Sequence, residues 1–352
     1  MRRRLLLASA ASLPLLPLAP RAVAQPDPLN AAPVRGPRDL PYPQRAEVQE
    51  FIDGLVQTHG LERGWLERVL AQGRYSEPAE RLTTPARASP AARNWLDYRA
   101  RNVDERRIRD GVAFFRQHRD TLARMSAQYG VPEAIAVSII GIETVFGRVM
   151  GSFRTIDVLL TLAFDYPRRA ALYREELAHF LLMCREVGLD PASVRGSFAG
   201  AMGMPQFMPG SVRRYAVDFD GDGRVDLTRS TDAIGSVGSF LAGHGWQREH
   251  PVQFAARADR SVVETLGRGI RAQYRWADVA ALGVSIAPSA RLDDDARVLL
   301  LDLPLVTPNG EEATEYRLGT VNMSALLHYN RSYFYGVAVA ELAEAILARS
   351  IA

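Results

Sequence analysis

Residues 131–148 read "VPEAIAVSIIGIETVFGR", a largely apolar run in which Glu133 lies near the start and a second carboxylate, Glu143, lies within the apolar part. At roughly 100° per residue, Ile135, Ile139 and Ile142 share one face of a helix. Glu143 falls on the edge of that face, where a charged group is costly unless it is paired or protonated. The stretch therefore predicts a buried helix and raises the question of why an acid lies in it.

The ends of this helix are also indicated. Pro132 suits its first position, and Gly147 suits the position just past its end. Burial beside isoleucines would raise the pKa of Glu143, as a general acid needs near neutral pH. Most glycosidases use two carboxylates. Asp157 and Asp165 are close in sequence, but no motif marks either as a partner, so a solvated or ion-paired Glu143 stays open at this point.

The flanking segments indicate a mainly α-helical protein. Helical patterns that end in glycine occupy residues 47–60 and 62–73. Residues 105–130, "ERRIRDGVAFFRQHRDTLARMSAQYG", predict one long amphipathic helix that ends at Gly130. Further helical patterns cover 168–188 and 230–245.

Residues 249–320 have a different pattern. The runs "ARVLLLDLPLV" (296–306) and "EATEYRLGTVN" (312–322) are rich in strand-forming residues and flank the turn "TPNGEE". We expect a helical region at 46–248, a small α/β insertion at 249–320, and C-terminal helices at 321–352 that complete the core.

The first residues, "MRRRLLLASAASLPLLPLAPRAVAQ", predict a secretory signal peptide at 1–24 with an Ala-Val-Ala cleavage site. Its apolar core is short and interrupted by proline, and the export route, general or twin-arginine, stays open. Residues 25–45 predict a Pro-rich flexible lead-in. The only cysteine, Cys184, is far from the signal, so we expect neither an internal disulfide nor a lipid anchor, and the expected location is the periplasm, in soluble form.

The charge of the expected mature chain is close to neutral. The full sequence has 43 basic and 40 acidic residues, and four of the arginines lie before residue 25. That leaves 39 basic against 40 acidic residues, so the composition does not favour a nucleic-acid partner.

Residues 218–232, "DFDGDGRVDLTRSTD", resemble an EF-hand calcium loop. Its first, third and fifth positions are Asp218, Asp220 and Asp222, and Arg224 at the seventh would offer its backbone carbonyl. The twelfth position is an arginine where a glutamate is usual, so Asp232 would close the shell. An acidic surface turn is the alternative.

Residues 196–211, "GSFAGAMGMPQFMPGS", combine glycines with polar and apolar side chains. Ser197 and Gln206 offer neutral donors and acceptors, and Phe207 offers an apolar surface, a mixture that suits a sugar. A tightly packed loop explains the same residues equally well. No nucleophile elbow, phosphate loop or zinc-binding motif occurs in the sequence.

Six segments together identify a family resemblance: "SIIGIETVFGRVMG", "FDYPRRA", "GSFAGAMGMPQFMPGS", "YAVDFDGDG", "DAIGSVGSFLAGHGW" and "HYNRSYFYGVAVAEL". They resemble the lytic murein transglycosylase B family from about Glu47 to the C-terminus. The resemblance implies a lysozyme-like helical core with an α domain and a small β-containing insertion. It also implies a carbon–oxygen lyase that cleaves the β-1,4 bond between N-acetylmuramic acid and N-acetylglucosamine in peptidoglycan.

The resemblance assigns roles to individual residues. Glu143 matches a single acid/base that protonates the glycosidic oxygen and then deprotonates the muramyl C6 hydroxyl, which gives a 1,6-anhydromuramyl end. The matching sugar-binding residues are Tyr98, Ser197, Gln206, Tyr329 and Asn330. Arg168 and Arg169 match basic residues suited to muramyl lactyl or peptide carboxylates. The calcium loop also matches, with Asp232 in place of the residue at position twelve.

Two alternatives remain beside the transglycosylase. One is a hydrolytic lysozyme-type muramidase on the same fold, and the other is a non-catalytic, calcium-stabilised wall-binding protein. We expect Ca²⁺ as a structural ion, no organic cofactor, and a monomer that binds peptidoglycan glycan strands. Cell-wall synthesis enzymes are a further class of partner that the sequence leaves open.

Overall fold

The computed structural model describes residues 4–5, 40–84 and 94–351. Most of the expected signal peptide and lead-in therefore lies outside the described residues, apart from a two-residue strand, β1 (Arg4–Leu5), and the segment from residue 40. The chain forms two compact units, each built from segments that are distant in sequence. Of the described residues, the first unit comprises 4–5, 40–84, 151–202 and 208–210, and the second comprises 94–150, 203–207 and 211–351.

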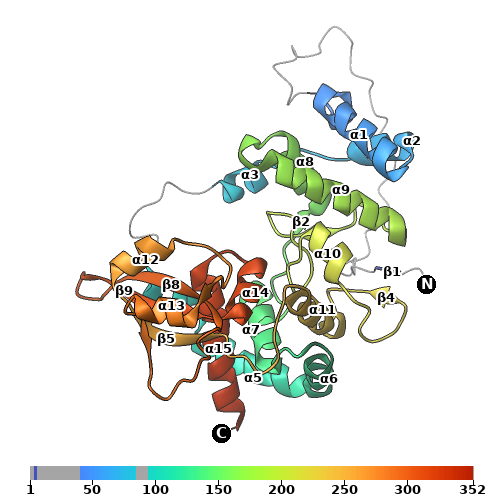
Figure 1. Ribbon diagram of the computed structural model, residues 1–352. Helices are drawn as coiled ribbons and strands as arrows, with labels where there is room; N and C mark the ends of the chain where they lie inside the picture. The colour runs from blue at the N-terminus through green and yellow to red at the C-terminus, as the bar shows by residue number, and fades with distance from the viewer. Residues whose placement is uncertain (1–3, 6–39, 85–93, 352) are drawn as a thin grey trace. The chain divides into compact units, whose positions relative to one another are not determined.

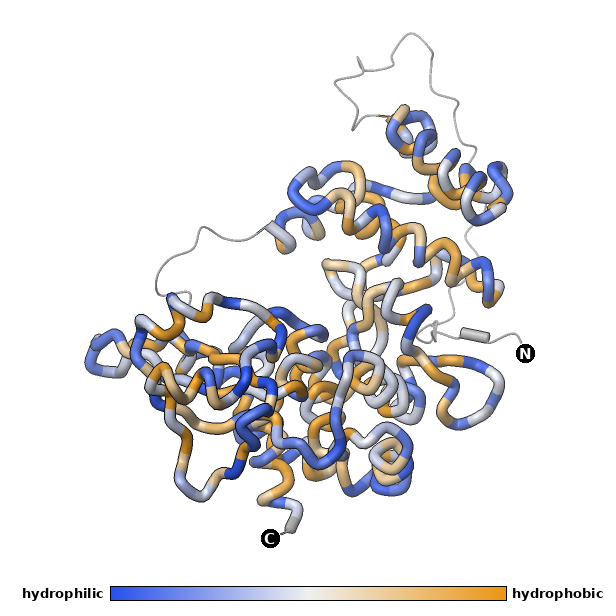
Figure 2. The backbone as a smooth tube through the Cα atoms, viewed as in Figure 1, coloured by the Kyte–Doolittle hydropathy of each residue, from blue (hydrophilic) through white to orange (hydrophobic). Residues whose placement is uncertain are grey.

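The first unit is helical, with one short pair of strands. Its elements are η3 (Tyr42–Gln44), α1 (Ala46–His59), α2 (Arg63–Leu70), α3 (Glu77–Thr83), β2 (Phe153–Arg154), α8 (Thr155–Phe164), η5 (Pro167–Arg169), α9 (Ala170–Val187) and β3 (Arg195–Gly196). Helices α8 and α9 pack against each other, and β2 pairs antiparallel with β3. The alternation of hydrophobic and hydrophilic residues along α9 shows that it is amphipathic (Figure 2), so its apolar side lies in this unit's core.

The second unit combines helices with a five-stranded sheet (Figure 1). Its helices are α4 (Trp95–Asn102), α5 (Glu105–Gln117), α6 (Arg119–Tyr129), α7 (Glu133–Thr144), α10 (Pro209–Tyr215, from residue 211 onward), α11 (Ser230–Gly243), α12 (Arg260–Leu266), α13 (Trp276–Ala281), α14 (Val321–Tyr329) and α15 (Tyr333–Ile351). Its strands are β4 (Arg224–Val225), β5 (Gln253–Arg257), β6 (Tyr274–Arg275), β7 (Ser285–Ile286), β8 (Arg297–Val306) and β9 (Glu312–Gly319).

Helix α7 lies at the centre of the second unit. It packs against α5, α6, α11 and α15, and every residue from Ala134 to Gly141 is buried. The expected buried helix around Glu143 is therefore present. Because α7 is enclosed on all sides rather than along one stripe, its sequence is apolar almost all the way round.

The long helix expected over residues 105–130 is wrong in one respect. The chain forms two helices, α5 and α6, which meet at His118. The backbone of His118 has φ −113° and ψ 22°, which ends the first helix and begins the second. The amphipathic pattern continues across the break because both helices bury one face, so periodicity alone does not reveal it.

The end of α7 also differs from the expected one. The helix stops at Thr144, and the next two residues, Val145 and Phe146, adopt left-handed φ angles of 50° and 59°. This conformation is strained for side chains other than glycine. The Thr144 hydroxyl holds the turn, since it accepts from the Gly147 amide at 3.0 Å and donates to the Met204 carbonyl at 3.0 Å. Glu143 thus lies in the last turn of α7, directly before a strained turn.

The sheet confirms the two predicted strands and the turn between them. Its order is β6-β8-β9-β5-β7, and every pairing is antiparallel. Leu299, Leu301 and Leu303 face a core that includes Trp95 of α4 and Met323 of α14. Side chains alternate along a strand, so Val298 and Leu300 face the other way, into a second core with α12 and α13.

The fold is mainly α-helical with a small β portion, as expected. The strands β5 to β9 all lie within residues 249–320. The helical region at 46–248 contributes to both compact units, so the two units do not coincide with the segments expected from sequence. The exact domain boundaries stay a prediction.

Candidate active site

Glu143 is a partly buried carboxyl at the C-terminal end of α7. Burial is the main cause that raises the pKa of Glu143 from 4.5 to about 7. No other carboxylate contributes to this shift among the described residues. A carboxyl with this pKa holds its proton in part of the molecules at neutral pH, and its conjugate base is also accessible there.

Three tyrosines from three helices surround Glu143. Burial, and next to it the charge of Glu143, raises the pKa of Tyr98 (α4) to about 12. The same two causes raise the pKa values of Tyr329 (α14) and Tyr335 (α15) well above 10. All three phenols are therefore neutral at physiological pH. They form a polar but uncharged wall around one acid, which is the kind of surface that a sugar can occupy.

Tyr335 was not predicted as a site residue. Its hydroxyl is buried and has no hydrogen bond of normal geometry within the described parts of the chain. Its interaction with the Glu143 carboxyl lowers the pKa of that carboxyl, against the larger effect of burial. The sequence signal was only its place in "HYNRSYFYG". The bend between α14 and α15 brings its ring parallel to that of Tyr329, with centroids 6.2 Å apart.

Gln206 lies on the short segment 203–207, which is attached to the end of α7 through Thr144 and Met204. Its backbone is left-handed, with φ 49°. Its amide nitrogen donates to the carbonyls of Met150 at 3.1 Å and Gly203 at 2.9 Å. These two hydrogen bonds fix the side chain through its amide nitrogen. The amide oxygen is the atom of this side chain that can accept a hydrogen bond.

Aromatic packing holds Tyr98 and Tyr329 in place. Tyr98 stacks on buried Trp95, with centroids 6.3 Å apart, and also contacts Phe334. The Tyr329 hydroxyl donates to the Pro205 carbonyl, which ties α14 to the segment of Gln206. The structure therefore brings Glu143, Tyr98, Gln206 and Tyr329 together in one unit.

Asn330 follows Tyr329 and forms the C-cap of α14. Its side-chain oxygen accepts from the Ser332 amide at 3.1 Å, and its backbone N–H donates to the Leu326 carbonyl. The side chain is exposed. Asn330 thus shapes the turn between α14 and α15, and its predicted contact with sugar stays a prediction.

Ser197, Arg168 and Arg169 belong to the first unit. The Ser197 hydroxyl accepts from the backbone amides of Ala199 at 3.3 Å and Ala201 at 3.0 Å, so it shapes a tight loop after β3. Both arginines are exposed on η5. The loop predicted at 196–211 is divided, because residues 203–207 belong to the second unit. The hydrogen bonds of Ser197 support the packing reading of this loop, and its sugar-binding role stays a prediction.

The two acids near Glu143 in sequence are engaged elsewhere. Asp165 is buried and accepts from Arg45 at 2.9 Å and from the Tyr42 hydroxyl at 2.7 Å. Asp157 accepts from the Arg74 amide at 3.0 Å and from Arg154 at 3.1 Å. Both belong to the first unit, where they hold structure together. Neither presents a free carboxylate of the kind that a second catalytic acid requires.

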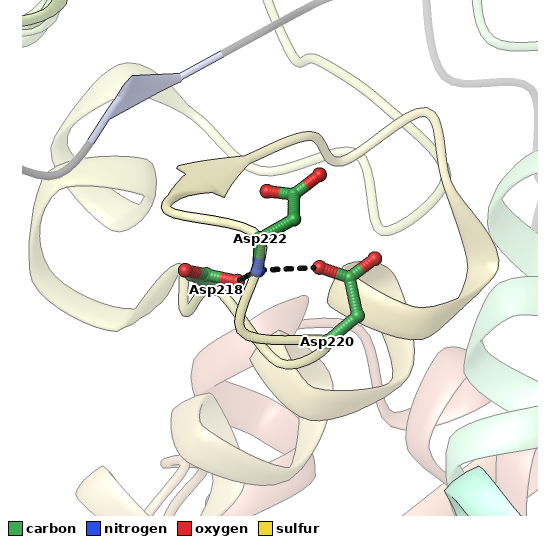
Figure 3. Close-up of side chains that lie close together, drawn as sticks. All are labelled: Asp218, Asp220 and Asp222. Carbon is green, nitrogen blue, oxygen red and sulfur yellow. Dashed lines mark hydrogen bonds between the residues drawn. The ribbon is translucent and has the colours of Figure 1, made fainter.

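The predicted cation loop is formed (Figure 3). Asp218, Asp220 and Asp222 each offer an oxygen atom within 4.8 Å of the others. The glycines of this loop, Gly221 and Gly223, have φ angles of 79° and 86°, as its tight turn demands. Amides of the loop donate to Asp218 from Gly221 at 2.7 Å and from Gly223 at 2.8 Å. The donor set and the turn fit a hard cation such as Ca²⁺.

Asp232 and Arg229 lie next to this loop. Asp232 is buried, and its two oxygens accept from the amides of Phe219 at 2.8 Å and Asp226 at 2.7 Å. It therefore ties both ends of the loop to α11. The Arg229 guanidinium lies 3.5 Å from Asp220 and 3.3 Å from Asp222. A positive charge from the chain itself thus partly neutralises the three aspartates.

A family model described as "Transglycosylase SLT domain" matches residues 43–344. Membrane-bound lytic murein transglycosylase B of Escherichia coli is 39% identical over 312 residues, which cover 87% of this chain and 84% of that protein.

Solved structures of lytic transglycosylases are also similar to this chain. The catenated lytic transglycosylase SltB1 from Pseudomonas aeruginosa has a TM-score of 0.79 and 39% identity, over 87% of this chain and 98% of its own. The Escherichia coli lytic transglycosylase Slt35 in complex with calcium has a TM-score of 0.73 and 38% identity, over 86% and 93%. SltB3 from Pseudomonas aeruginosa, in complex with NAG-NAM-pentapeptide, has a TM-score of 0.69 and 27% identity, over 86% and 79%.

Proposed function

Since this chain belongs to the SLT transglycosylase family and is a lytic transglycosylase that acts on peptidoglycan, we propose that Glu143 is its single catalytic acid and base. The observation that supports this role is one partly buried carboxyl with a pKa of about 7, enclosed by three neutral tyrosines. No second carboxylate acts on it within the described residues.

The proposed reaction needs only one carboxyl group. Protonated Glu143 donates its proton to the glycosidic oxygen while the bond from that oxygen to muramyl C1 breaks. The acetamido group of the same sugar stabilises the positive centre. The muramyl C6 oxygen then bonds to C1, and the Glu143 carboxylate accepts the C6 hydroxyl proton. The carboxyl is restored, no water is consumed, and the product is a 1,6-anhydromuramyl end.

The surrounding residues have proposed binding roles. Tyr98 and Tyr329 would contact the sugars beside Glu143, because both feel the charge of its carboxyl. Gln206 would contact them too, because it shares the unit of Glu143 and follows Pro205, to which Tyr329 is bonded. Asn330, Ser197, Arg168 and Arg169 would bind further parts of the glycan or the acidic groups on it. Mass spectrometry of digested sacculi tests the reaction type. Anhydro ends support the proposal, whereas reducing ends alone would identify a hydrolase.

The pH dependence of kcat/KM should report the pKa of Glu143. The first step requires the protonated carboxyl, and the raised pKa keeps that form present up to about pH 7. Above this pH, kcat/KM should fall by about tenfold per pH unit. The Tyr335 contact lowers the pKa of Glu143, so Tyr335→Phe should move the falling limb to higher pH.

Tyr329→Phe is the matched control for this pH profile. It also removes one buried hydroxyl beside Glu143, but Tyr329 does not contribute to the shifted pKa of that carboxyl. We expect lower activity with an unchanged position of the limb. If the falling limb of the kcat/KM profile moves equally in both variants, or moves in neither, Tyr335 does not lower the pKa of Glu143.

We further propose that the loop at 218–232 binds Ca²⁺ as a structural ion. Asp218, Asp220, Asp222 and Asp232 would hold it through carboxylates, and Arg224 through its backbone carbonyl. The proposal is supported by the cluster of three aspartates and by the similarity to Slt35, which was solved with calcium. The ion would hold the loop against α11 and take no part in bond cleavage.

Removal of calcium should lower the melting temperature. An ion that binds only the folded state stabilises it by about 2.7 kcal/mol when its concentration is 100 times its Kd. Differential scanning calorimetry with EDTA, and then with excess CaCl₂, should show a decrease that calcium reverses. A melting temperature that changes with neither EDTA nor CaCl₂ would show that the loop does not bind a stabilising calcium ion.

Two substitutions sharpen the calcium test. Arg229→Gln removes the charge beside Asp220 and Asp222, so calorimetric titration should show binding that is tighter by a few-fold. Arg68→Gln removes an exposed arginine that is paired with Glu62 in the first unit, and it should leave the calcium Kd unchanged.

We also propose that the protein works in the periplasm after removal of the signal peptide at 1–24. Its substrate is located outside the cytoplasm, and the sequence of this segment has the pattern of an export signal. Among the residues that the structure describes, no helix is both long and apolar enough to cross a bilayer.

A further inference from the structure

Helix α7, which carries Glu143, ends differently from other helices of this chain. Helices α1, α6 and α9 each end at a glycine in the left-handed conformation, namely Gly60, Gly130 and Gly188. Helix α7 instead ends at Val145, with φ 50° and ψ 51°, and Phe146 follows with φ 59°. This conformation is costly for a β-branched or bulky residue, whereas glycine adopts it freely. Contacts outside the turn must therefore hold it in place.

The first of these contacts is made by the side chain of Phe146. Its ring lies against Gly141, which is earlier in the same helix, so that a Cβ atom added there would meet the ring at 2.7 Å. A Cβ atom added at Gly111 of α5 would meet the ring at 3.3 Å and Ile346 at 2.4 Å. The ring centroid is also 5.4 Å from that of Phe114 of α5. The ring thus fills a seat between α7 and α5, which we call the Phe146 seat.

The glycine in the Phe146 seat is unusual for its position. Gly141 is buried within α7, where glycine is less favourable than alanine because its backbone loses more freedom on folding. The methyl group of an alanine would overlap the ring of Phe146. The close approach of the ring therefore explains why this helical position has no side chain.

An ion pair fixes the chain just after the turn. The Arg148 guanidinium donates to the carboxylate of Asp110 on α5 at 2.5 Å. The Asp110 side chain is only 11% exposed, and Arg106 and Arg109 lie 3.7 Å and 3.1 Å from it. The hydrogen bond from Arg148 is the main cause that lowers the pKa of Asp110, so this carboxyl is charged at neutral pH. Helix α5 thus holds the turn through both a ring and an ion pair.

We propose that Phe146 is a positioning residue for the reaction: with its ring in this seat, it holds the last turn of α7 and so keeps the Glu143 carboxyl in its partly buried place beside Tyr335. The inference rests on the proposed function, which gives that carboxyl its catalytic use. Phe146 acts through Glu143 and needs no contact with the sugar. Burial is the main cause that raises the pKa of Glu143, so an empty seat, which lets water approach the carboxyl, should lower that pKa towards 4.5.

The pH dependence of kcat/KM in Phe146→Ala tests the proposal. The falling limb should move to lower pH by about one unit, and kcat at pH 7 should decrease about fivefold, because fewer molecules hold the Glu143 proton. KM should change by less than about twofold, since the sugar-binding residues keep their places. A merely weakened fold would lower the rate at every pH without displacing the limb. The expected displacement is also opposite in direction to that of Tyr335→Phe.

Gly141→Ala is a second variant, which closes the Phe146 seat from the other side. It should fold, because alanine favours a helix more than glycine does. Its methyl group displaces the ring, so the limb should again move to lower pH. In a Phe146→Ala background the same change should move the limb no further. Gly54→Ala in α1 is the matched control, since a Cβ atom there has no neighbour within 4 Å, and it should leave the limb in place.

A limb that stays in place in both Phe146→Ala and Gly141→Ala would overturn the proposal. An equal effect of Gly141→Ala with and without the Phe146 ring would do the same. Titration of the Glu143 carboxyl by ¹³C NMR, with its signal identified by its loss in Glu143→Gln, measures the displacement without catalysis. An unchanged Glu143 pKa in Phe146→Ala would contradict the positioning role alone. A wild-type kcat/KM limb that does not follow this titration would contradict the proposed function alone.

Discussion

Glu143→Gln should reduce the formation of anhydromuramyl ends by roughly 10³-fold or more, since it removes a group that acts as both acid and base. Glutamine has the same shape and can neither donate nor accept the required proton. Binding of the glycan should change little, because the amide preserves the volume and polarity beside the three tyrosines. The loss should therefore appear in kcat, measured by release of soluble muropeptides from sacculi.

The same substitution should stabilise the protein at alkaline pH. The folded pKa of Glu143, about 7, lies above the unfolded value of 4.5, so the ionised form is disfavoured in the folded state. The contribution of protonated Glu143 to the free energy of unfolding is fully present below pH 4.5. It is lost as the pH rises through the folded pKa of about 7. At about 1.4 kcal/mol per pKa unit, Glu143→Gln should gain at most about 3.5 kcal/mol at pH 8, and little at pH 4.

Glu133→Gln provides the control for both effects. Glu133 lies in the first turn of the same helix, at the other end from Glu143. Its substitution should leave the activity unchanged and should not reproduce the gain in stability that Glu143→Gln shows at pH 8. If Glu143→Gln retained more than a tenth of the wild-type rate, Glu143 would not be the single catalytic group.

Trp95→Ala should destabilise the protein by about 3–5 kcal/mol, the usual cost of removing a large buried aromatic side chain. Trp95 is fully buried in the core that joins α4, β8, α14 and α15. It also supports Tyr98 and Phe334, with ring centroids 6.3 Å and 5.5 Å away. Urea denaturation should show the loss of stability, and activity should fall at temperatures where the variant is still folded.

Trp95→Phe separates packing from the position of Tyr98. It retains an aromatic ring in the same core and should cost less than half as much stability as the alanine variant. If activity decreases in proportion to stability in the two variants, the role of Trp95 is purely structural. Normal stability in Trp95→Ala would contradict the packing described here.

The sequence predicted those features that depend on local patterns. The apolar run around Glu143, the strands β8 and β9, and the spacing of Asp218, Asp220 and Asp222 could all be read directly. Each of these patterns is determined by neighbouring residues, whether through helical periodicity, strand propensity or a loop of fixed length.

Other features depend on contacts between distant segments. The break at His118 is hidden because α5 and α6 both continue the amphipathic pattern. The left-handed turn at Val145 depends on the contact of Thr144 with Met204, 60 residues away. Tyr335 joins the site only because α15 turns back beside α14. The family resemblance pointed to residues, but their roles in shaping turns came from the fold.

Digestion of sacculi in H₂¹⁸O, followed by mass spectrometry of the released muropeptides, tests the central claim most directly. A single carboxyl that drives internal cyclisation produces anhydromuramyl ends, with no ¹⁸O incorporated from the solvent. The wild-type protein should give this product, and Glu143→Gln should give almost none. Muramyl reducing ends that carry ¹⁸O would show that water attacks C1 and would contradict the proposed role of Glu143.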